Sequence, residues 1–426
     1  MEYTLRDYQI EAVDAALRFF SSKPKYHALE VLPTGSGKSL IIANIAKELN
    51  EPILIFQPRK EILEQNLSKL LSYGHYATAY SASVGQKRLS PITFATIGSV
   101  IKKTDILKDF KHIIVDECHF VNAKGGMYRD LFQKLGKVKI LGLTATPYRL
   151  VTDGYGGSIL KFLTRTRPRV FKDLIYYVQN EELFTQGYLA KLKYQSTNGF
   201  DRSQLRLNTT GADYTDRSVM GYFDQVNFKD RIANVVNDLK RARRGILVFT
   251  RFVKEAQYLT DNIPGAAIIT AKTHKRIREQ TLNSFKSGRI PVVCNVGVLS
   301  VGFDYPELDT IIMARPTLSL ALFYQMIGRA IRPHPLKDHA LVVDMCDNLR
   351  MFGSIEKLRI NDGGNGKWFI SNNGKQLTNI YYGERSGHNG RKVWKARGKN
   401  QINRENAGDR PEGQGDLQDL YRGKEE

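Results

Sequence analysis

The chain has 426 residues, 42% of them hydrophobic and 25% charged, which is the composition of a globular protein with enough apolar residues for a core. Its formal net charge of +21 favours a polyanionic partner, of which nucleic acid is the usual one. Three widely separated cysteines argue against a disulfide framework or a cysteine-based zinc site, and no apolar run is long enough to predict a membrane span.

Apolar runs alternate with helix-like stretches in the first part of the chain, and this alternation predicts a parallel sheet with crossover helices. These runs are 28–32, 53–56, 92–94, 113–115 and 140–143, with a helix expected at 60–73. A second series predicts another such unit, at 245–249, 267–270, 291–294, 310–313 and 341–343, with a helix from an N-cap at Thr273 to Phe285. We therefore predict an α/β fold of two tandem units, 1–155 and 229–350, joined by an irregular segment, 156–228, and followed by an extension, 351–426.

A glycine-rich turn follows the first apolar run. It comprises Pro33, Thr34, Gly35, Ser36 and Gly37, and it leads into Lys38 and Ser39. Backbone N–H groups at such a strand-to-helix turn bind phosphate, a lysine there reaches the β- and γ-phosphates, and a serine hydroxyl ligates Mg²⁺. The general pattern begins with glycine where this chain has Leu32, so an ordinary glycine-rich turn is the alternative.

Two acidic residues, Asp116 and Glu117, follow the apolar run 113–115. Side chains of adjacent residues at a strand end point in different directions, so Asp116 is a candidate Mg²⁺ ligand while Glu117 polarises a water molecule beside the γ-phosphate. A capping or surface role is the alternative for an isolated acidic pair. The position of this pair downstream of the glycine-rich turn, in the same predicted unit, favours the catalytic interpretation.

The connecting segment is basic between residues 161 and 169, with Phe171, Tyr176 and Tyr177 close behind. Cations and aromatic rings together suit a surface that grips a nucleic-acid strand. A solvated loop with core aromatics is an equally good interpretation. The extension is rich in glycine and basic residues, and its stretch 385–399 contains Trp394 and no acidic residue. We expect this tail to be poorly ordered without a ligand and to bind the phosphate backbone of a nucleic acid.

A helix is predicted from Thr317 to Arg332. Gln325, Arg329 and Arg332 share one face of it, opposite an apolar stripe. Arginines held rigidly in this way can act as arginine fingers on a transferring phosphoryl group. A solvent-facing salt-bridge face is the alternative.

Seven motifs in order carry a resemblance to a known family. They are Leu5–Gln9, Pro33–Ser39, Pro58-Arg59, Asp116-Glu117-Cys118-His119, Thr144–Pro147, Val298–Asp304 and Gln325–Arg332. In this order they resemble the superfamily 2 helicases of the DEAH-type branch, in particular RadD-like and phage UvsW-like branch-migration helicases. The resemblance implies two RecA-like domains that share one ATP in the cleft between them.

The same resemblance implies further residue roles. Gln9 would read the adenine edge with Arg6 or Tyr8 beside the base, and Gly302 and Asp304 would contact nucleotide from the second domain. His119 and the 144–146 turn would couple the nucleotide site to the strand. The residues expected to face the strand backbone are Arg59, Thr96, Ser99, Thr250, Arg251 and Thr270.

The resemblance implies an ATP- and Mg²⁺-dependent DNA helicase or translocase that remodels branched or single-stranded DNA without sequence preference. The alternatives are the motor of a restriction or defence system, an RNA helicase, and a nucleic-acid-binding scaffold that has lost catalysis. We expect a monomer in the cytoplasm of a bacterial or phage-infected cell, with neither zinc nor a membrane as partner.

Overall fold

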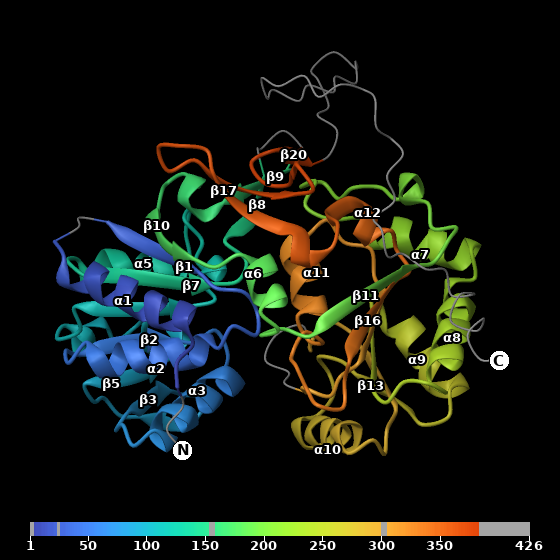
Figure 1. Cartoon of the computed structure of the whole chain (residues 1–426), viewed down its shortest axis with the longest axis horizontal. Helices are drawn as coiled ribbons and strands as arrows, with labels where there is room; N and C mark the ends of the chain where they lie inside the picture. The colour runs from blue at the N-terminus through green and yellow to red at the C-terminus, as the bar shows by residue number, and fades with distance from the viewer. Residues whose placement is uncertain (1–3, 24–25, 153–157, 300–304, 383–426) are drawn as a thin grey trace, which may run out of the picture. The chain divides into compact units, whose positions relative to one another are not determined.

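The computed structural model describes residues 4–23, 26–152, 158–299 and 305–382 (Figure 1). The chain forms two compact units, each assembled from three segments. The first unit consists of Met1–Arg149, Lys161–Leu183 and Arg359–Ser371. The second unit consists of Leu150–Leu160, Phe184–Leu358 and Asn372–Glu426.

The first unit is built on an eight-stranded sheet with the order β10-β1-β7-β6-β2-β5-β3-β4, in which only the β3–β4 pair is antiparallel. The strands are β1 (His27–Val31), β2 (Ile53–Phe56), β3 (Thr78–Ser81), β4 (Gln86–Lys87), β5 (Ile92–Ala95), β6 (His112–Asp116), β7 (Lys139–Thr144) and β10 (Phe171–Tyr177). The helices are α1 (Asp7–Ser21), α2 (Lys38–Glu48), α3 (Lys60–Ser72), α4 (Ile97–Val100) and α5 (Met127–Leu135), with short 3₁₀ turns at Thr104–Leu107, Cys118–Phe120 and Leu163–Arg165.

The second unit contains an entirely parallel six-stranded sheet with the order β11-β16-β15-β12-β14-β13. Its strands are β11 (Lys191–Ser196), β12 (Ile246–Thr250), β13 (Ala266–Ile269), β14 (Val292–Asn295), β15 (Thr310–Ala314) and β16 (His339–Asp344). The helices are α7 (Asp216–Gln225), α8 (Phe228–Leu239), α9 (Val253–Asn262), α10 (Lys275–Lys286), α11 (Leu320–Ile327) and α12 (Asn348–Phe352), with 3₁₀ turns at Arg202–Gln204 and Ile355–Lys357. Helix α6 (Asn180–Thr185) spans a boundary between the units.

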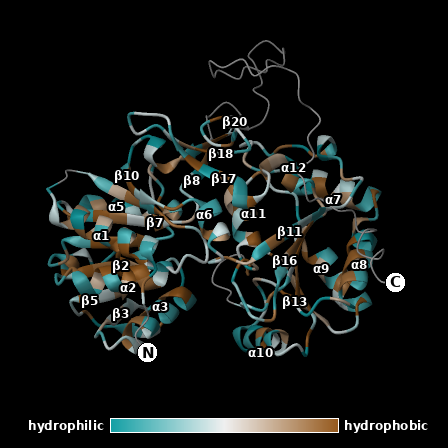
Figure 2. Cartoon of the chain, in the orientation of Figure 1, coloured by the Kyte–Doolittle hydropathy of each residue, from teal (hydrophilic) through white to brown (hydrophobic). Residues whose placement is uncertain are grey.

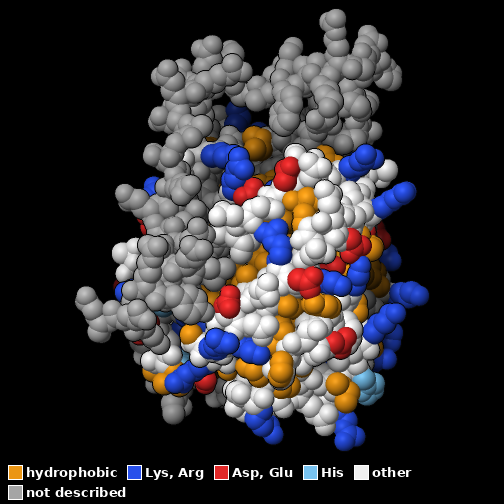
Figure 3. All heavy atoms as spheres, turned by 90° about the vertical axis from the view of Figure 1, so that its right-hand side faces the viewer, with side chains coloured by type: hydrophobic (Ala, Val, Ile, Leu, Met, Phe, Trp, Pro, Cys, Tyr) orange, Lys and Arg blue, Asp and Glu red, His pale blue; other side chains and the backbone are white. Residues whose placement is uncertain are grey.

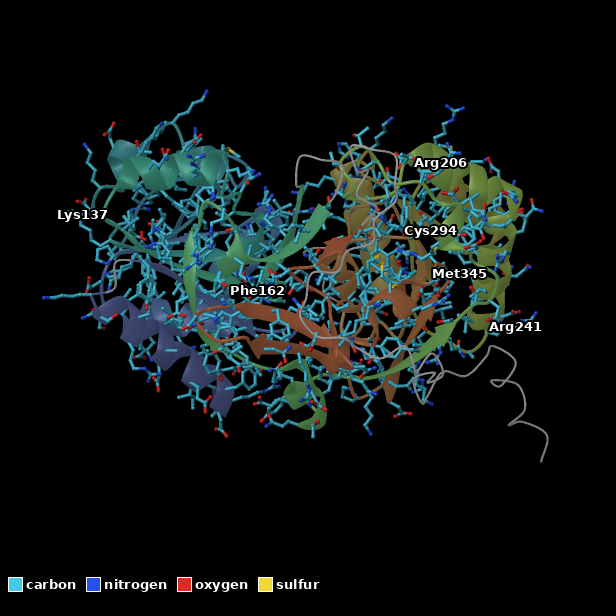
Figure 4. The ribbon with its side chains drawn as sticks, turned by 90° about the horizontal axis from the view of Figure 1, so that it is seen from above. Lys137, Phe162, Arg206, Arg241, Cys294 and Met345 are labelled. Atoms are coloured by element: carbon cyan, nitrogen blue, oxygen red, sulfur yellow. The ribbon has the colours of Figure 1, made fainter. Side chains whose placement is uncertain are left out.

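The strands of both sheets are mostly apolar. This is expected, since parallel strands that are buried on both faces consist of continuous hydrophobic runs. Figure 2 shows the strands of both units as largely hydrophobic. All of β2 is fully buried, and so is Cys294 of β14. Figure 4 shows Cys294 and Met345 inside the second unit, where both belong to one buried cluster. The predicted α/β fold with two mostly parallel sheets is confirmed.

The described residues also form two small three-stranded sheets. One has the order β17-β18-β19, from β17 (Leu358–Asp362), β18 (Trp368–Asn372) and β19 (Lys375–Gln376). The other has the order β20-β9-β8, from β20 (Tyr381–Tyr382), β9 (Ser158–Phe162) and β8 (Tyr148–Thr152).

The segments predicted as a connection and an extension are more ordered than their composition suggested. Residues 156–228 supply β10 to the first sheet and β11 to the second, and residues 359–371 belong to the first unit. Both strands lie at sheet edges and mix polar with apolar residues, so the core-strand pattern did not reveal them. The stretch 385–399 lies outside the described residues.

Two helix predictions differ from the structure in their ends. Helix α11 covers only Leu320–Ile327, and successive three-residue turns follow it, with the Arg329 N–H donating to Met326 at 3.2 Å. Helix α10 has His274 at its N-cap position, without a side-chain capping bond, and the Thr273 hydroxyl accepts from the Thr270 N–H at 2.9 Å.

No helix of the described residues is long and apolar enough to cross a membrane. In the same part of the chain, no three His, Cys, Asp or Glu side chains gather where they could hold a metal ion. All three cysteines are buried thiols.

Candidate active site and nucleic-acid interface

The glycine-rich turn has the backbone of a phosphate-binding loop. Gly35 and Gly37 adopt φ values of 83° and 81°, a left-handed conformation that favours glycine. Gly37 is also the N-cap of α2, so the helix dipole adds positive charge beside the turn. A Cβ on Gly37 would lie 2.5 Å from Gln9 Nε2, which leaves no room for a side chain.

Gln9 of α1 fastens this loop. Its Nε2 donates to the Ser36 carbonyl at 2.8 Å, its Oε1 accepts from the Arg6 N–H at 3.0 Å, and the Tyr8 hydroxyl donates to the same Ser36 carbonyl at 2.8 Å. The Arg6 guanidinium reaches the Tyr8 hydroxyl at 3.4 Å. The structure therefore brings Arg6, Tyr8 and Gln9 together against the loop, while their contact with adenine stays a prediction.

Lys38 lies between the loop and the acidic pair. Its Nζ donates to the Leu32 carbonyl at 3.3 Å and lies 4.0 Å from Glu117 Oε1. Both side chains are mostly buried, so these charges interact in a poorly solvated setting. The predicted association of Lys38 with the residues after β6 is thus present in the geometry.

Asp116 ends β6 as a buried residue, and the Glu117 N–H donates to its Oδ1 at 2.9 Å. Burial, together with the Glu117 carboxylate, raises the pKa of Asp116 to about 7. Glu117 itself adopts φ 50°, a left-handed conformation that is costly for a residue with a Cβ.

His119 links Glu117 to the end of β7. Its Nδ1 lies 2.9 Å from Thr144 Oγ1, 3.1 Å from Thr146 Oγ1 and 3.3 Å from Glu117 Oε2. The Thr144 hydroxyl also accepts from the Thr146 N–H at 3.0 Å. A single imidazole therefore contacts both Glu117 and the 144–146 turn.

The loop fits a phosphate group and the acidic pair fits a divalent cation. Among the described residues, the buried Ser36 hydroxyl has no hydrogen-bond partner, so a donor stands ready in the loop. Ser39, in the first turn of α2, and Asp116 offer the oxygen ligands that Mg²⁺ prefers. Burial raises the pKa of Asp116 most and the Glu117 carboxylate raises it further, and a bound cation would offset the negative charge of the pair. Pro33 and Thr34 lie in the same turn.

In the second unit, Gln325 lies on α11 and the two arginines follow the helix. The Arg329 Nε donates to the Gln325 carbonyl at 3.2 Å. Burial lowers the pKa of Arg332. The structure therefore brings Arg329 against Gln325, and all three residues lie on a helix end followed by turns and not on one continuous helical face. Gly302 and Asp304 lie outside the described residues.

Lys337 is a residue that sequence reasoning missed. Its buried Nζ donates to the carbonyls of Pro306, Leu308 and Ala330 at 2.7, 3.1 and 2.9 Å. The amine thereby ties the turn beside Arg329 to the residues before β15. Lysine is rarely buried, and nothing in its sequence neighbourhood signals this position.

Comparison with known proteins agrees with this geometry. Residues 2–149 match the family described as the res subunit of type III restriction enzymes, and residues 229–334 match the helicase conserved C-terminal domain. A 51.5 kDa protein of a Lactococcus phage (isolate 7-9) is 29% identical over 75% of this chain and 66% of its own length. The ATP-dependent DNA helicase uvsW of Enterobacteria phage T4 is 23% identical over 74% of this chain and 64% of its own length.

The chain belongs to the superfamily 2 helicases. Its fold is also that of the DNA-bound type ISP restriction-modification enzyme LlaBIII, with a TM-score of 0.57 and 16% identity over 80% of this chain and 27% of that one. The chain spans between about half and two thirds of the length of the first curated relatives it matches.

The expected strand-facing residues of the first unit are exposed or half-buried. Arg59 is exposed at the N-cap of α3. Thr96 and Ser99 lie together, with their hydroxyl oxygens 2.9 Å apart, and Ser81 contacts Thr96 at the same distance. These hydroxyl groups form one polar cluster at the ends of β3 and β5.

The expected strand-facing residues of the second unit are placed differently. The Arg251 guanidinium donates to Asp216 at 2.9 Å, to Asp213 at 3.2 Å and to the Tyr214 carbonyl at 2.7 Å. Its side chain is only 7% exposed, so it stabilises the loop before α7 and is not presented to a strand. Thr250 is buried, and half-buried Thr270 accepts from the Lys272 N–H at 3.1 Å. Sequence motifs could not anticipate that Asp213 and Asp216 would engage Arg251.

Proposed function

We propose that this chain is an ATP-dependent DNA helicase or translocase that remodels branched or single-stranded DNA in recombination, repair or replication. The observation that carries the proposal is the Lys38–Glu117 pair at 4.0 Å beside a phosphate-type loop, in a chain that matches both helicase-domain families. The name of the phage T4 relative, a DNA helicase, favours DNA over RNA. The phage relatives of this chain suggest that the chain acts in a bacterial or phage-infected cell.

In this proposal the loop residues 33–37 hold the phosphates of ATP, and Lys38 leaves the Leu32 carbonyl to neutralise them. Ser39 and Asp116 would hold Mg²⁺, which would stabilise the charge of the transferring phosphoryl group. Glu117 orients the attacking water. Because His119 contacts Glu117, Thr144 and Thr146, it passes the state of the nucleotide to the 144–146 turn.

We propose that Gln325, Arg329 and Arg332 of the second unit act on the same nucleotide, together with Gly302 and Asp304. Neither set of charges is complete alone, so turnover requires both units to engage one triphosphate. Nucleotide then drives movement only by as much as it binds the engaged state more tightly than the disengaged one. A DNA strand held through its phosphates, without sequence preference, would be advanced by this cycle. We propose a monomer as the working form.

The test is ATP turnover by the purified chain with a DNA fork, single-stranded DNA, blunt duplex or RNA, followed by strand displacement on the fork. We expect the fork or single strand to stimulate most, and Lys38→Ala to abolish turnover with every nucleic acid. Strongest stimulation by RNA would reassign the chain as an RNA helicase. Absence of turnover in the wild type would leave a nucleic-acid-binding scaffold.

A second candidate is the motor of a restriction or defence system. It is favoured by the match of residues 2–149 to the restriction res family and by the fold shared with LlaBIII. Such a motor would move along duplex DNA without separating its strands. Displacement of a third strand from duplex DNA, with no unwinding of forks, would support this candidate over the first.

A further inference from the structure

A basic surface lies on the first unit, away from the ATP-binding loop in sequence and from every helicase motif. It comprises Arg165, Arg167, Arg169, Lys172 and Lys367, with the aromatic rings of Tyr177 and Trp368. We call these seven residues the hairpin surface, because two of them come from the β17–β18 hairpin. Sequence reasoning left the 161–169 stretch undecided between a strand-gripping surface and a solvated loop.

The hairpin is fixed to edge strand β10 by specific contacts within the first unit. The Gln179 amide donates to the Ile360 carbonyl at 2.9 Å and accepts from its N–H at 3.0 Å. At the hairpin tip, a Cβ on Gly366 would lie 4.0 Å from the Lys172 carbonyl oxygen. The Gly366 carbonyl accepts from the Thr164 hydroxyl at 3.5 Å. Lys367 is therefore held beside the arginine segment, although about 200 residues separate them in the chain.

The cations of the hairpin surface have no acidic partner among the described residues. None of the five forms an ion pair there within 4.0 Å, although their charges lie close enough that Arg167 and Arg169, together with burial, lower the pKa of Arg165. The acidic groups nearby are engaged elsewhere. Asp173 accepts from the Tyr26 hydroxyl, Asp362 from the Gly364 N–H, and Glu181 pairs with Arg359.

Like charges gathered in one place repel one another, and a ligand of opposite charge relieves this repulsion. The face viewed in Figure 3 differs, since Lys and Arg side chains there are interspersed with acidic ones. A group of arginines and lysines without acidic neighbours is typical of a surface that binds the phosphate backbone of a nucleic acid.

The aromatic residues restrict the type of ligand. The rings of Tyr177 and Trp368 meet edge to face, with centroids 5.5 Å apart. Tyr177 is 36% exposed, which is high for a large ring on a strand. An exposed aromatic ring beside cations offers a stacking platform to an unpaired base, which a duplex cannot use because its bases are already stacked.

We propose that the hairpin surface is a second binding site for single-stranded DNA, a few nucleotides long, on the first unit. Its cations contact phosphates and its aromatic pair stacks on a base. The inference rests on the proposed function, since it gives the motor an additional hold on its track. It assigns a role to residues 359–371, which return to the first unit after the chain has completed the second sheet.

The test is the affinity of a fluorescein-labelled oligo-dT strand, measured by anisotropy at several salt concentrations without nucleotide. The variant is Arg167→Ala with Arg169→Ala, because both side chains are exposed. Loss of two phosphate contacts should weaken binding roughly tenfold and reduce the slope of log affinity against log salt by about 1.4. Turnover of ATP without DNA should not change.

The matched control is Arg217→Ala with Arg241→Ala, which removes the same charge from exposed positions on the second unit. Figure 4 shows Arg241 at the periphery. Equal loss of affinity and slope in both double variants would mean a general charge effect and would overturn the proposal. In another outcome, DNA stimulates ATP turnover by the wild type, and the Arg167→Ala, Arg169→Ala variant binds oligo-dT normally. This result would overturn the inference and leave the proposed function standing. A wild type that binds no DNA would overturn both.

A spectroscopic test addresses the aromatic pair. The chain has two tryptophans, so Trp394→Phe leaves Trp368 as the sole indole. Added oligo-dT should quench its fluorescence at the concentrations that saturate anisotropy, because a stacked base alters the ring's surroundings. Unchanged emission at saturation would exclude Trp368 from the site.

Discussion

At the scale of single residues, charges in this protein are placed by contacts that lie far apart in sequence. The Arg251 guanidinium is occupied by Asp213 and Asp216, whereas Lys38 has Glu117 at 4.0 Å, the upper limit of an ion pair. A buried pair at close range would hold Lys38 in place, while this looser one leaves it able to move to a phosphate. The difference separates a structural cation from one available for chemistry.

Arg329→Ala should reduce DNA-stimulated turnover by about 10³-fold or more, the range for loss of an arginine finger, while ATP binding changes much less. The physical reason is that charge on the transferring phosphoryl group develops in the transition state. Steady-state kinetics and binding of a fluorescent ATP analogue measure the two effects. Arg241→Ala serves as the surface control, and full turnover in Arg329→Ala would remove this arginine from the mechanism.

The buried Lys337 amine predicts a pH effect on stability. Burial lowers its pKa to about 8, whereas an unfolded lysine titrates near 10.5. Between these values the unfolded state binds more protons, so the free energy of unfolding rises with pH. Relative to Lys337→Met, the wild type should gain about 2 kcal/mol between pH 7 and 9.5.

Guanidinium unfolding of both proteins at the two pH values, followed by circular dichroism, measures this gain. Lys286→Met provides the comparison, because it removes a second lysine whose pKa is lowered by burial and by the charge of Arg332. If the free energy of unfolding depended on pH in the same way in the wild type and in Lys337→Met, the lowered pKa of Lys337 would be contradicted.

At the scale of elements, β6 and β7 position the acidic motif by close packing. Gly142 of β7 faces the turn that follows β6, and a Cβ there would lie 2.7 Å from Cys118 Sγ and 2.8 Å from the Phe171 ring. The turn after β6 carries Glu117 and His119, so this approach restricts the position of the Glu117 carboxylate. The sequence Ile140–Thr144 shows an ordinary strand and gives no hint of the constraint.

Gly142→Ala should therefore destabilise the first unit by about 1–3 kcal/mol, the usual cost of overpacking, and should lower turnover by displacing Glu117. Thermal unfolding and the ATPase assay measure both. Gly125→Ala is the matched control, since a Cβ at Gly125 has no heavy atom within 4 Å. Equal stability of the two variants would show that Cys118 and Phe171 can move aside without cost.

Most core elements were predictable because buried parallel strands leave continuous apolar runs, as in Ile53–Phe56. Strands β10 and β11 were not, because edge strands carry polar residues and lack that signal. The end of α11 was also missed, since the turns after Ile327 keep a helix-like apolar spacing while their N–H groups bond three residues back.

At the scale of the whole molecule, two units must engage one nucleotide for the proposed mechanism to operate. All three native cysteines are buried, so maleimide dyes will label introduced surface cysteines selectively. Lys137→Cys on the first unit and Arg241→Cys on the second provide exposed positions, both labelled in Figure 4.

Addition of a non-hydrolysable ATP analogue with single-stranded DNA should change energy transfer between dyes at these positions, because nucleotide favours the engaged state. The same chain with Lys38→Ala should show little change. Transfer that is identical with and without nucleotide in the wild type would contradict a mechanism based on engagement of the two units.

The α/β class, the two sheets, the phosphate-type loop and the acidic motif were all predictable from sequence. They depend on local patterns: apolar runs, glycine at left-handed positions, and charged residues at strand ends. Which charges are satisfied became visible only in the folded chain. Folding placed Arg251 with two carboxylates, Lys337 among three carbonyls, and the hairpin cations without an acidic partner in the described chain. Partners that meet through folding are distant in sequence, so charge compensation is a property of the folded chain and not of any motif.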